Sequence, residues 1–322
     1  YISISEERTF GYNTPLYKSS PVNVYMTPEE AESLLEEGSA DLIMLGRSTL
    51  ADPFWPVKAQ MGHSEDIVPC IRCLQCYHVS TDHKNVQCSV NPRFNREKRV
   101  PLILPVTGHP KHLVIVGGGP AGITCALTAS RRGHQVTLLE KEPVLTGKLN
   151  IACHGEHKAD LRRFRDYLLT QLRKSSVTVH TGVLADTDVV RDLKPDALVI
   201  AVGATPSRIP LPGVDGDNCI QISEFLQSPD TSLQHYIIIG GGSVGWETAL
   251  DLAEKGKDVS IIEMTDCLAS ASNDLYRLAL SEHFARYDNL HTNLNSACQS
   301  IDADGVNVLT NGASTHILSL IH

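Results

Sequence analysis

The sequence has few aromatic residues, no long apolar run and no surplus of positive charge. Aromatic residues make up 5% of the 322 residues, and 28 Lys plus Arg stand against 37 Asp plus Glu, a net charge of −9. Because phosphate binding needs a basic surface, nucleic acid is excluded as the main partner. No segment approaches the ~18 consecutive apolar residues that cross a bilayer, so we expect no membrane partner and a small-molecule substrate.

A secretion signal is also missing. The N-terminal segment carries charged side chains and no apolar core, which predicts a cytoplasmic location. The chain has nine cysteines, and an odd number without secretion argues against a disulfide framework. Four of them lie close together, which is typical of a metal site inside the cell. The chain begins at Tyr1 rather than at Met, a first indication that a piece is missing.

The clustered cysteines follow the pattern Cys70-x2-Cys73-x2-Cys76-x11-Cys88. A Cys-x2-Cys-x2-Cys run is typical of iron–sulfur clusters, whose irons take thiolate ligands from a tight loop. Zinc modules usually have two separated Cys-x2-Cys pairs, so the spacing favours iron–sulfur and leaves structural zinc as the alternative. After residue 88 there is no Cys-x2-Cys or Cys-x4-Cys pair, which argues against a dithiol reductase.

Two stretches share one pattern of strand, glycine-rich turn, helix, strand and acidic residue. Leu113–Glu140 aligns with Tyr236–Glu263 without a gap, which predicts an α/β fold with two Rossmann-like β-α-β dinucleotide-binding units. In each motif the first glycine permits a tight turn, the third lets the backbone approach a pyrophosphate, and the last lets the helix pack on the strand. The acid binds the ribose. The predicted cofactor-binding residues are Gly117, Gly119, Ala121, Gly122 and Glu140, and Gly240, Gly242, Gly245 and Glu263.

The order of the two units predicts their cofactors. Two such units in one chain indicate a flavin reductase, with FAD on the first and the nicotinamide nucleotide on the second. The carboxylate of Glu263 would repel a 2′-phosphate, which favours NAD(H) over NADP(H). Gly203 ends a predicted strand at the crossover between the two units. Glu247 has two interpretations of equal weight, as an acid that complements a helix dipole and as a residue near the nicotinamide.

Local patterns predict several further elements. Thr27 begins a helix over 28–37, and the apolar run 41–45 is predicted to be a buried strand. The other predicted elements are a helix over 158–174, strands over 177–180 and 197–202, a helix over 274–287, and a hairpin with its turn at 302–305.

Together these motifs resemble the iron–sulfur flavoenzymes related to 2,4-dienoyl-CoA reductase, enoate reductase and trimethylamine dehydrogenase. Members have an FMN-binding TIM barrel of the old yellow enzyme type, a 4Fe-4S loop, and FAD and NAD(P) domains. The matching segments are Ala40–Arg47 with Ala51–Pro53, Pro69–Cys73 with Cys88–Pro92, and Glu140–Lys141 with Thr146–Leu149. The resemblance implies that Arg47, next to Gly46, holds the FMN phosphate. It also implies that Lys141, Gly147 and Lys148 belong to the FAD-binding segment.

Several departures accompany the resemblance. Many dienoyl-CoA reductases place three residues between the second and third cysteines, whereas this chain has two, which suggests another branch. The predicted strand 21–26 lacks the glycine that is common near the FMN phosphate. Residues 1–62 are too few for a TIM barrel, which takes at least ~200 residues, and no returning FAD-domain segment follows Glu263. The chain is therefore expected to be an internal fragment of a longer enzyme.

These observations predict four parts and one function. Residues 1–62 are the C-terminal remnant of the barrel, 63–108 the iron–sulfur module and linker, 109–233 the incomplete FAD domain, and 234–322 the truncated NAD(H) domain. In the longer enzyme, electrons pass from NADH through FAD and 4Fe-4S to FMN and reduce an activated C=C bond of the enoate or dienoyl-CoA type. The alternatives are a non-catalytic electron-transfer module and a zinc-stapled nucleotide-binding module. Catalytic residues are not predicted, and a homo-oligomeric state of the longer enzyme is left open.

Overall fold

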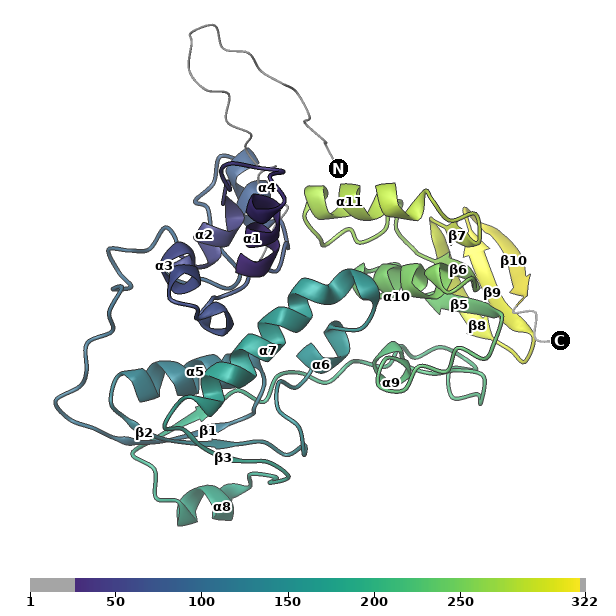
Figure 1. Cartoon of the computed structure of the whole chain (residues 1–322). Coiled ribbons are helices and arrows are strands. Elements are labelled where there is room, and N and C mark those ends of the chain that lie inside the picture. Colours follow the sequence, from purple (N-terminus) through teal and green to yellow (C-terminus); the bar gives the residue numbers. More distant parts are fainter. Residues whose placement is uncertain (1–26, 319–322) are drawn as a thin grey trace, which may run out of the picture. The chain divides into compact units, whose positions relative to one another are not determined.

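A computed structural model describes residues 27–318 and divides the chain into two compact units (Figure 1). Of the described residues, unit 1 takes 27–150 and Asp160–Val202, and unit 2 takes Ile151–Ala159 and 203–318. The predicted strand 21–26 lies outside the described residues. Within residues 27–318, the helices are all too short or too polar to cross a membrane.

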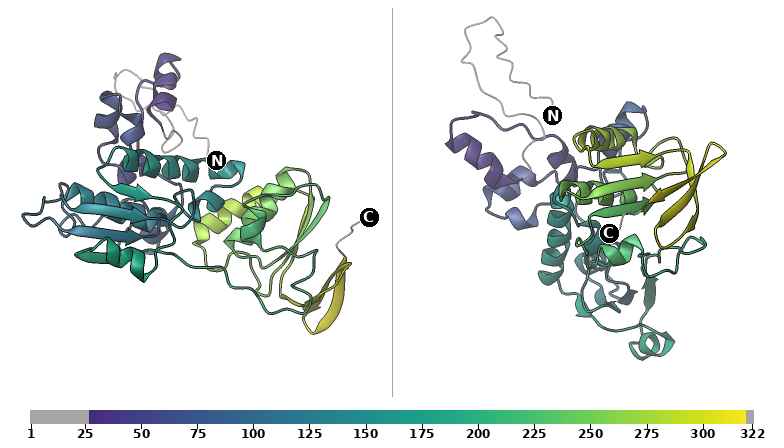
Figure 2. Two further views of the ribbon diagram at one scale, coloured as in Figure 1. Left: turned by 90° about the horizontal axis from the view of Figure 1, so that it is seen from below. Right: turned by 90° about the vertical axis from the view of Figure 1, so that its right-hand side faces the viewer.

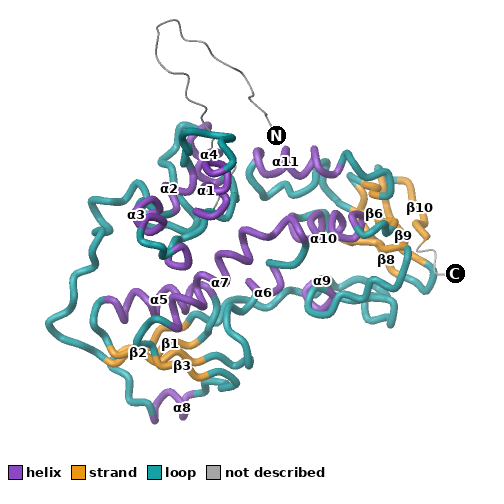
Figure 3. Tube along the Cα trace, in the orientation of Figure 1, coloured by secondary structure: helices purple, strands orange, loops and turns teal. Residues whose placement is uncertain are grey.

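Unit 1 begins with a helical part that carries the four clustered cysteines, and we call residues 27–100 the cysteine module. Its helices are α1 (Pro28–Glu36), α2 (Arg47–Ala51), α3 (Trp55–Gln60) and α4 (Gln75–Thr81), and Figure 3 shows them joined by loops. Thr27 caps α1 as predicted. Its hydroxyl accepts the Glu30 N–H at 3.2 Å, and the Glu30 carboxylate accepts the Thr27 N–H at 3.1 Å.

The prediction of a buried strand over 41–45 is wrong. Leu42 forms a single bridge, residues 43–45 have no regular structure, and the side chains of Leu42 and Met44 are exposed. A strand needs neighbours for its backbone N–H and C=O groups. No sheet formed by the described residues includes this segment, so its apolar composition alone does not make it a strand.

The rest of unit 1 is built on a four-stranded parallel sheet in the order β3-β2-β1-β4. Its strands are β1 (His112–Val116), β2 (Gln135–Leu139), β3 (Thr178–His180) and β4 (Ala197–Ile200). The connecting helices are α5 (Pro120–Arg131), α7 (Ala159–Arg173) and α8 (Thr187–Asp192), and the short α6 (Leu149–Ala152) spans the point where the chain passes into unit 2. Figure 1 shows α5 and α7 on one side of the strands and α8 on the other. The predicted β-α-β unit is confirmed, and β4 ends two residues before the predicted strand 197–202 does.

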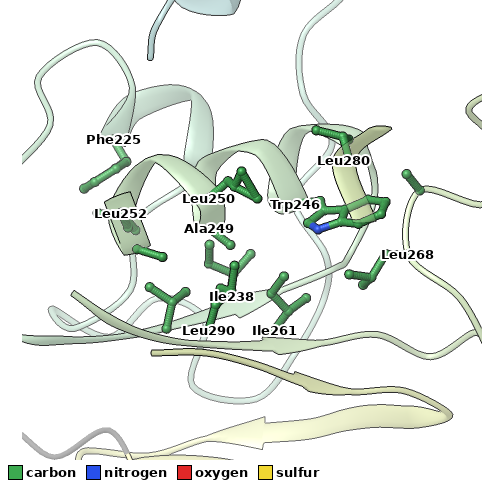
Figure 4. Packing of buried hydrophobic residues seen from close by; sticks show 13 residues of the cluster. Phe225, Ile238, Trp246, Ala249, Leu250, Leu252, Ile261, Leu268, Leu280 and Leu290 are labelled. Carbon is green, nitrogen blue, oxygen red and sulfur yellow. The ribbon is translucent and has the colours of Figure 1, made fainter. Parts of the chain in front are cut away.

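Unit 2 contains the second predicted β-α-β unit. Its parallel strands β5 (His235–Ile239), β6 (Asp258–Ile262) and β7 (Leu290–Asn293) lie in that order. The helices α10 (Ser243–Glu254) and α11 (Asp274–Phe284) pack on one face, and the short α9 (Ile222–Phe225) precedes β5. Figure 4 shows the core between them, where Ile238 and Ile261 from the strands meet Trp246 and Leu250 from α10.

A small antiparallel sheet covers the other face of these strands. It consists of β8 (Ser296–Ile301), β9 (Gly305–Thr310) and β10 (Ala313–Leu318) in the order β10-β9-β8. Ile262 points away from the helices, because successive side chains of a strand face opposite sides, and it packs against Val306 and Val308. Figure 2 shows the antiparallel strands in yellow beside the green parallel strands. The predicted hairpin with its turn at 302–305 is confirmed.

Candidate functional site

The first predicted dinucleotide loop follows β1. Gly117 has a φ of +109°, and a Cβ there would lie 2.3 Å from the carbonyl oxygen of Ala201. A Cβ on Gly122 would lie 1.8 Å from the carbonyl oxygen of Gly117. A Cβ on Gly119 would meet no atom of the described residues within 4 Å, which suits close approach of a pyrophosphate. Ala121 lies in the first turn of α5, where backbone N–H groups and the helix dipole attract phosphate.

Glu140 follows β2 and fixes this loop. Its side chain is only 7% exposed. One carboxylate oxygen accepts the N–H of Gly118 at 2.6 Å, and the other accepts the N–H of Glu142 at 2.9 Å. A carboxylate oxygen can accept more than one hydrogen bond, so both oxygens retain capacity for ribose hydroxyls.

The other residues of the predicted FAD-binding segment lie in the loop after Glu140. Gly147 has a φ of +51°, and a Cβ on it would lie 3.5 Å from the Cα of Gly119. Lys141 and Lys148 are exposed, and Lys141 pairs with Glu142 at 3.5 Å. Gly147 therefore lies at the first glycine loop, while the two lysines place positive charge at the surface.

The second predicted loop repeats the geometry of the first. Gly240 has a φ of +100°, and a Cβ on Gly245 would lie 2.1 Å from its carbonyl oxygen. Beside Gly242 there is open space among the residues of the described chain. Glu263 accepts the N–H of Gly241 at 2.7 Å, and its other oxygen accepts the N–H and the hydroxyl of Thr265, both at 2.8 Å.

The charge of Glu263 is stabilised where the sequence places the ribose. Burial raises the pKa of this carboxyl, but hydrogen bonds from Thr265 and from the Gly241 N–H outweigh burial and hold the pKa below its ordinary value. The carboxylate is therefore negative at neutral pH.

Gly203 is the predicted cofactor-binding glycine between the two loops. It has a φ of +70° and lies beyond the end of β4.

All four predicted metal ligands line one pocket. Cys70 and Cys73 come from the loop before α4, Cys76 from its first turn, and Cys88 from the loop that follows. Burial raises the pKa of the Cys70 thiol, while a hydrogen bond from the backbone of Arg72 lowers it. The other residues that line the pocket are Arg47, Leu50, Ile71, Leu74, Ser89 and Val90.

The spacing of these thiols distinguishes two kinds of metal site. Within residues 27–318, only His63, Glu65 and Asp66 bring three ligand atoms within 4.8 Å of one another, so no three of the cysteines do. A single tetrahedral zinc ion, with Zn–S bonds of ~2.3 Å, would need thiolates about 3.8 Å apart. The sulfur atoms are therefore not gathered at the spacing that a single zinc ion needs, and the donor set of four thiols fits an iron–sulfur cluster.

Two polar side chains lie beside the thiols, a position that was not predicted from the sequence for either of them. Arg47, the first residue of α2 after its N-cap Gly46, lines the pocket, and its positive charge lowers the pKa of Cys70 and Cys76 against the effect of burial. The hydroxyl of Ser89 lies 3.2 Å from the sulfur of Cys73. Arg47 and Ser89 reach the thiols because α2 and the loop 88–90 pack next to the cysteines. No local sequence pattern reveals that packing.

A further polar network in unit 2 was also missed. The carboxylate of Glu247 on α10 pairs with Lys158 at 2.5 Å and accepts the hydroxyl hydrogen bond of Tyr276 on α11. Burial and the nearby Glu247 charge raise the pKa of Tyr276. Lys158 is 118 residues from Tyr276 in sequence, so no local signal connects them. Glu247 is thus an ion-pair partner inside unit 2 as well as an acid near a helix start.

Comparisons with known proteins agree with the two dinucleotide units. Residues 111–320 match the family described as pyridine nucleotide-disulphide oxidoreductase. The NADH oxidase of Thermoanaerobacter brockii is 36% identical over 277 residues, which cover 82% of this chain and 42% of that protein. The cinnamate reductase of Clostridium sporogenes is 32% identical over 249 residues, which cover 77% of this chain and 37% of that one.

A solved structure extends the similarity to the cysteine module. The 2-naphthoyl-CoA reductase complex with 2-naphthoyl-CoA matches with a TM-score of 0.86 at 29% identity. The match covers 91% of this chain and 44% of that one. The chain therefore spans less than half the length of these relatives.

Proposed function

The chain belongs to the pyridine nucleotide-disulphide oxidoreductase family, and from this premise we propose that it is the electron-entry part of an iron–sulfur flavoenzyme. In this proposal the loop of unit 1 holds FAD, the loop of unit 2 holds NAD(H), and the four cysteines hold a 4Fe-4S cluster. The observation that carries the proposal is the cysteine pocket, in which four thiols from two loops and a helix line one cavity.

The residues of each site have distinct tasks. The bound flavin would supply the conversion between the two-electron chemistry of a nicotinamide and the one-electron chemistry of an iron–sulfur cluster. Gly119 and Gly242 leave room for phosphates beside the backbone. Glu140 and Glu263 each hold the N–H of a loop glycine and keep oxygen lone pairs for a ribose. Arg47 places a positive charge beside thiolates that carry negative charge.

The choice of nicotinamide nucleotide follows from Glu263. Its hydrogen bonds keep it ionised at neutral pH, and a fixed negative charge repels the 2′-phosphate of NADPH. No basic side chain is hydrogen-bonded to this carboxylate among the described contacts. We therefore assign NADH as the electron donor.

The substrate-reducing step belongs to the whole protein. In our proposal, residues 27–62 are the end of an FMN-binding TIM barrel, and Arg47 holds the FMN phosphate at the edge of the cysteine pocket. Two relatives are named for the reduction of cinnamate and of 2-naphthoyl-CoA. We accordingly propose an activated C=C bond, conjugated to a carboxylate or thioester, as the electron acceptor.

An anaerobic visible spectrum, recorded before and after addition of NADH, tests the proposal. The reconstituted chain should show flavin bands and broad iron–sulfur absorbance, and both should bleach with NADH and far more slowly with NADPH. The Cys73→Ala variant should lose the iron–sulfur absorbance and keep the flavin bands, and Cys219→Ser, outside the pocket, should retain both. Bound zinc in place of iron would overturn the cluster assignment, and flavin that stays oxidised with NADH would overturn hydride entry.

A further inference from the structure

The loop that carries the first three cysteines has a backbone conformation that its residues do not favour. Arg72 and Leu74 have φ values of +46° and +58°. The left-handed region is disfavoured for residues with a Cβ, because the Cβ crowds the carbonyl oxygen. Such residues turn successive N–H groups toward one side and form a concave site for anions, including iron–sulfur clusters. The N–H of Arg72 is already bonded to the thiol of Cys70.

A buried carboxylate holds the side chain of Arg72. Asp160, in the first turn of α7, is 6% exposed, and one of its oxygens accepts the Nε hydrogen bond of Arg72. The other oxygen accepts a hydrogen bond from Arg163 at 3.1 Å, and Arg163 also bonds to Glu30 of α1 at 2.9 Å. These contacts lie within unit 1 and join α1, α7 and the cysteine loop.

Asp160 is the member of this network that the protein encloses most. The side chains of Arg72 and Arg163 are 43% and 37% exposed, so water can solvate either arginine if a partner is lost. A carboxylate buried to this degree depends on its charged partners. Its removal would therefore take away the ion pair that ties Arg72 to α7 and weaken the attachment of the left-handed turn to that helix.

We propose that Asp160 is a positioning residue for the cysteine loop. It holds Arg72 so that Cys70 and Cys73 face the common pocket and the loop N–H groups point toward the sulfur atoms. This inference rests on the proposed function, because the group that the loop gathers is the cluster. It assigns to α7 of the flavin-binding part the task of shaping the metal site.

The chain offers a matched control at the other end of α7. Lys174 follows that helix and bonds to Glu65 at 2.7 Å and to Asp66 at 2.8 Å. This contact joins the same cysteine module to the same helix and does not touch the cysteine loop. Lys174→Gln therefore weakens the attachment of the module while leaving Arg72 and Asp160 in place.

Hydrogen exchange measured by mass spectrometry tests the inference without any metal. In the reduced, metal-free 322-residue chain, Asp160→Asn and Arg72→Gln should each speed exchange in the 70–76 peptide by ~10-fold, with Lys174→Gln within ~2-fold of wild type. The double variant should exchange little faster than either single variant, because the ion pair between Arg72 and Asp160 is already lost in each. Arg72→Gln changes a partly exposed side chain, so the test stands even if Asp160→Asn does not fold.

Retention of iron after reconstitution is the second readout. Asp160→Asn and Arg72→Gln should lose iron to a chelator ~10-fold faster than wild type, the effect expected when a group supporting metal ligands is removed. Exchange and iron loss at wild-type rates would overturn the inference, and so would a Lys174→Gln variant that behaves like Asp160→Asn. A wild-type chain that takes up no iron would instead overturn the proposed cluster, while the exchange rates would still decide the role of Asp160.

Discussion

The loop after β1 and the loop after β5 repeat one set of contacts at two places in the chain. A glutamate after the next strand accepts the N–H of the second glycine at 2.6 Å in the first, Glu140 to Gly118, and at 2.7 Å in the second, Glu263 to Gly241. The carbonyl of that glycine accepts an N–H at 2.7 Å in both loops. The glycine pattern and the acid thus set the same backbone path in both units.

The surroundings of the two loops differ. A Cβ on Gly117 would lie 2.3 Å from the carbonyl oxygen of Ala201, just beyond β4. A Cβ on Gly240 would meet no atom within 4 Å in the described part of the chain, where β5 is an edge strand of its sheet. The motif therefore fixes how the loop turns, and the neighbouring strand decides how much extra volume the loop tolerates.

The largest effects should come from the glycine that packs the helix on the loop. Gly122→Ala and Gly245→Ala each place a Cβ within 2.1 Å of a backbone carbonyl oxygen. Because backbone on both sides must move, each change should lower the unfolding free energy by about 4 kcal/mol. Urea unfolding of both variants measures this, and near wild-type stability for either would show that the two helices can shift.

The next prediction addresses the difference between the loops. Both Gly117 and Gly240 have positive φ values, so Gly240→Ala should cost ~1 kcal/mol from backbone strain alone. In Gly117→Ala the new Cβ also overlaps the carbonyl oxygen of Ala201, so the free energy of unfolding should fall by about 3 kcal/mol. Comparing the two unfolding curves isolates the contribution of the β4 neighbour, and equal losses would contradict the role given to it.

Substitutions at Gly119 and Gly242 test nucleotide binding rather than the stability of the fold. Gly119→Ala and Gly242→Ala add a methyl group where the described residues leave space, so stability should change by less than about 1 kcal/mol. Each methyl group would occupy the path of a pyrophosphate. We expect ~10-fold weaker binding of FAD in the first variant and of NADH in the second. Titration followed by flavin and nicotinamide fluorescence measures both, and unchanged affinities would place the phosphates elsewhere.

The sequence predicted these loops because the residues that set how each loop turns are local. Glycines, helix and acid lie within one β-α-β unit, and the resemblance to iron–sulfur flavoenzymes is confirmed by named relatives such as the cinnamate reductase. The prediction of a strand over 41–45 was wrong because a strand needs neighbouring strands to pair with, and the composition of the segment does not show whether they are present. The functions assigned to the site residues stay predictions.

Contacts between distant segments mark the limit of sequence reasoning here. The cysteine spacing predicted that four thiols gather, but it gave no sign that Arg47 lines their pocket. Arg72 and Asp160 are 88 residues apart, and each looks like an ordinary surface charge in its own segment. Such pairs depend on how whole elements pack, and only the structure reveals them.

The smallest expected effect concerns the pH dependence of the second loop. Burial raises the pKa of Glu263, but hydrogen bonds from Thr265 and Gly241 outweigh burial. The pKa of this carboxyl therefore lies below its ordinary value of 4.5. A carboxyl with a lowered folded pKa adds stability above its unfolded pKa and loses it as the pH falls through the folded value. Wild type should therefore be slightly more stable than Glu263→Gln at neutral pH, and the difference should fade only below about pH 4.5.

Urea unfolding of wild type and Glu263→Gln between about pH 3.5 and pH 7 measures this difference. A difference that stays constant to the acidic end would mean that the hydrogen bonds, rather than the charge, supply the stability. The same variant sharpens the nucleotide assignment. Removing the negative charge should bring the NADPH and NADH affinities closer together, because the 2′-phosphate is no longer repelled. An unchanged preference would mean that residues other than Glu263 exclude the phosphate from unit 2.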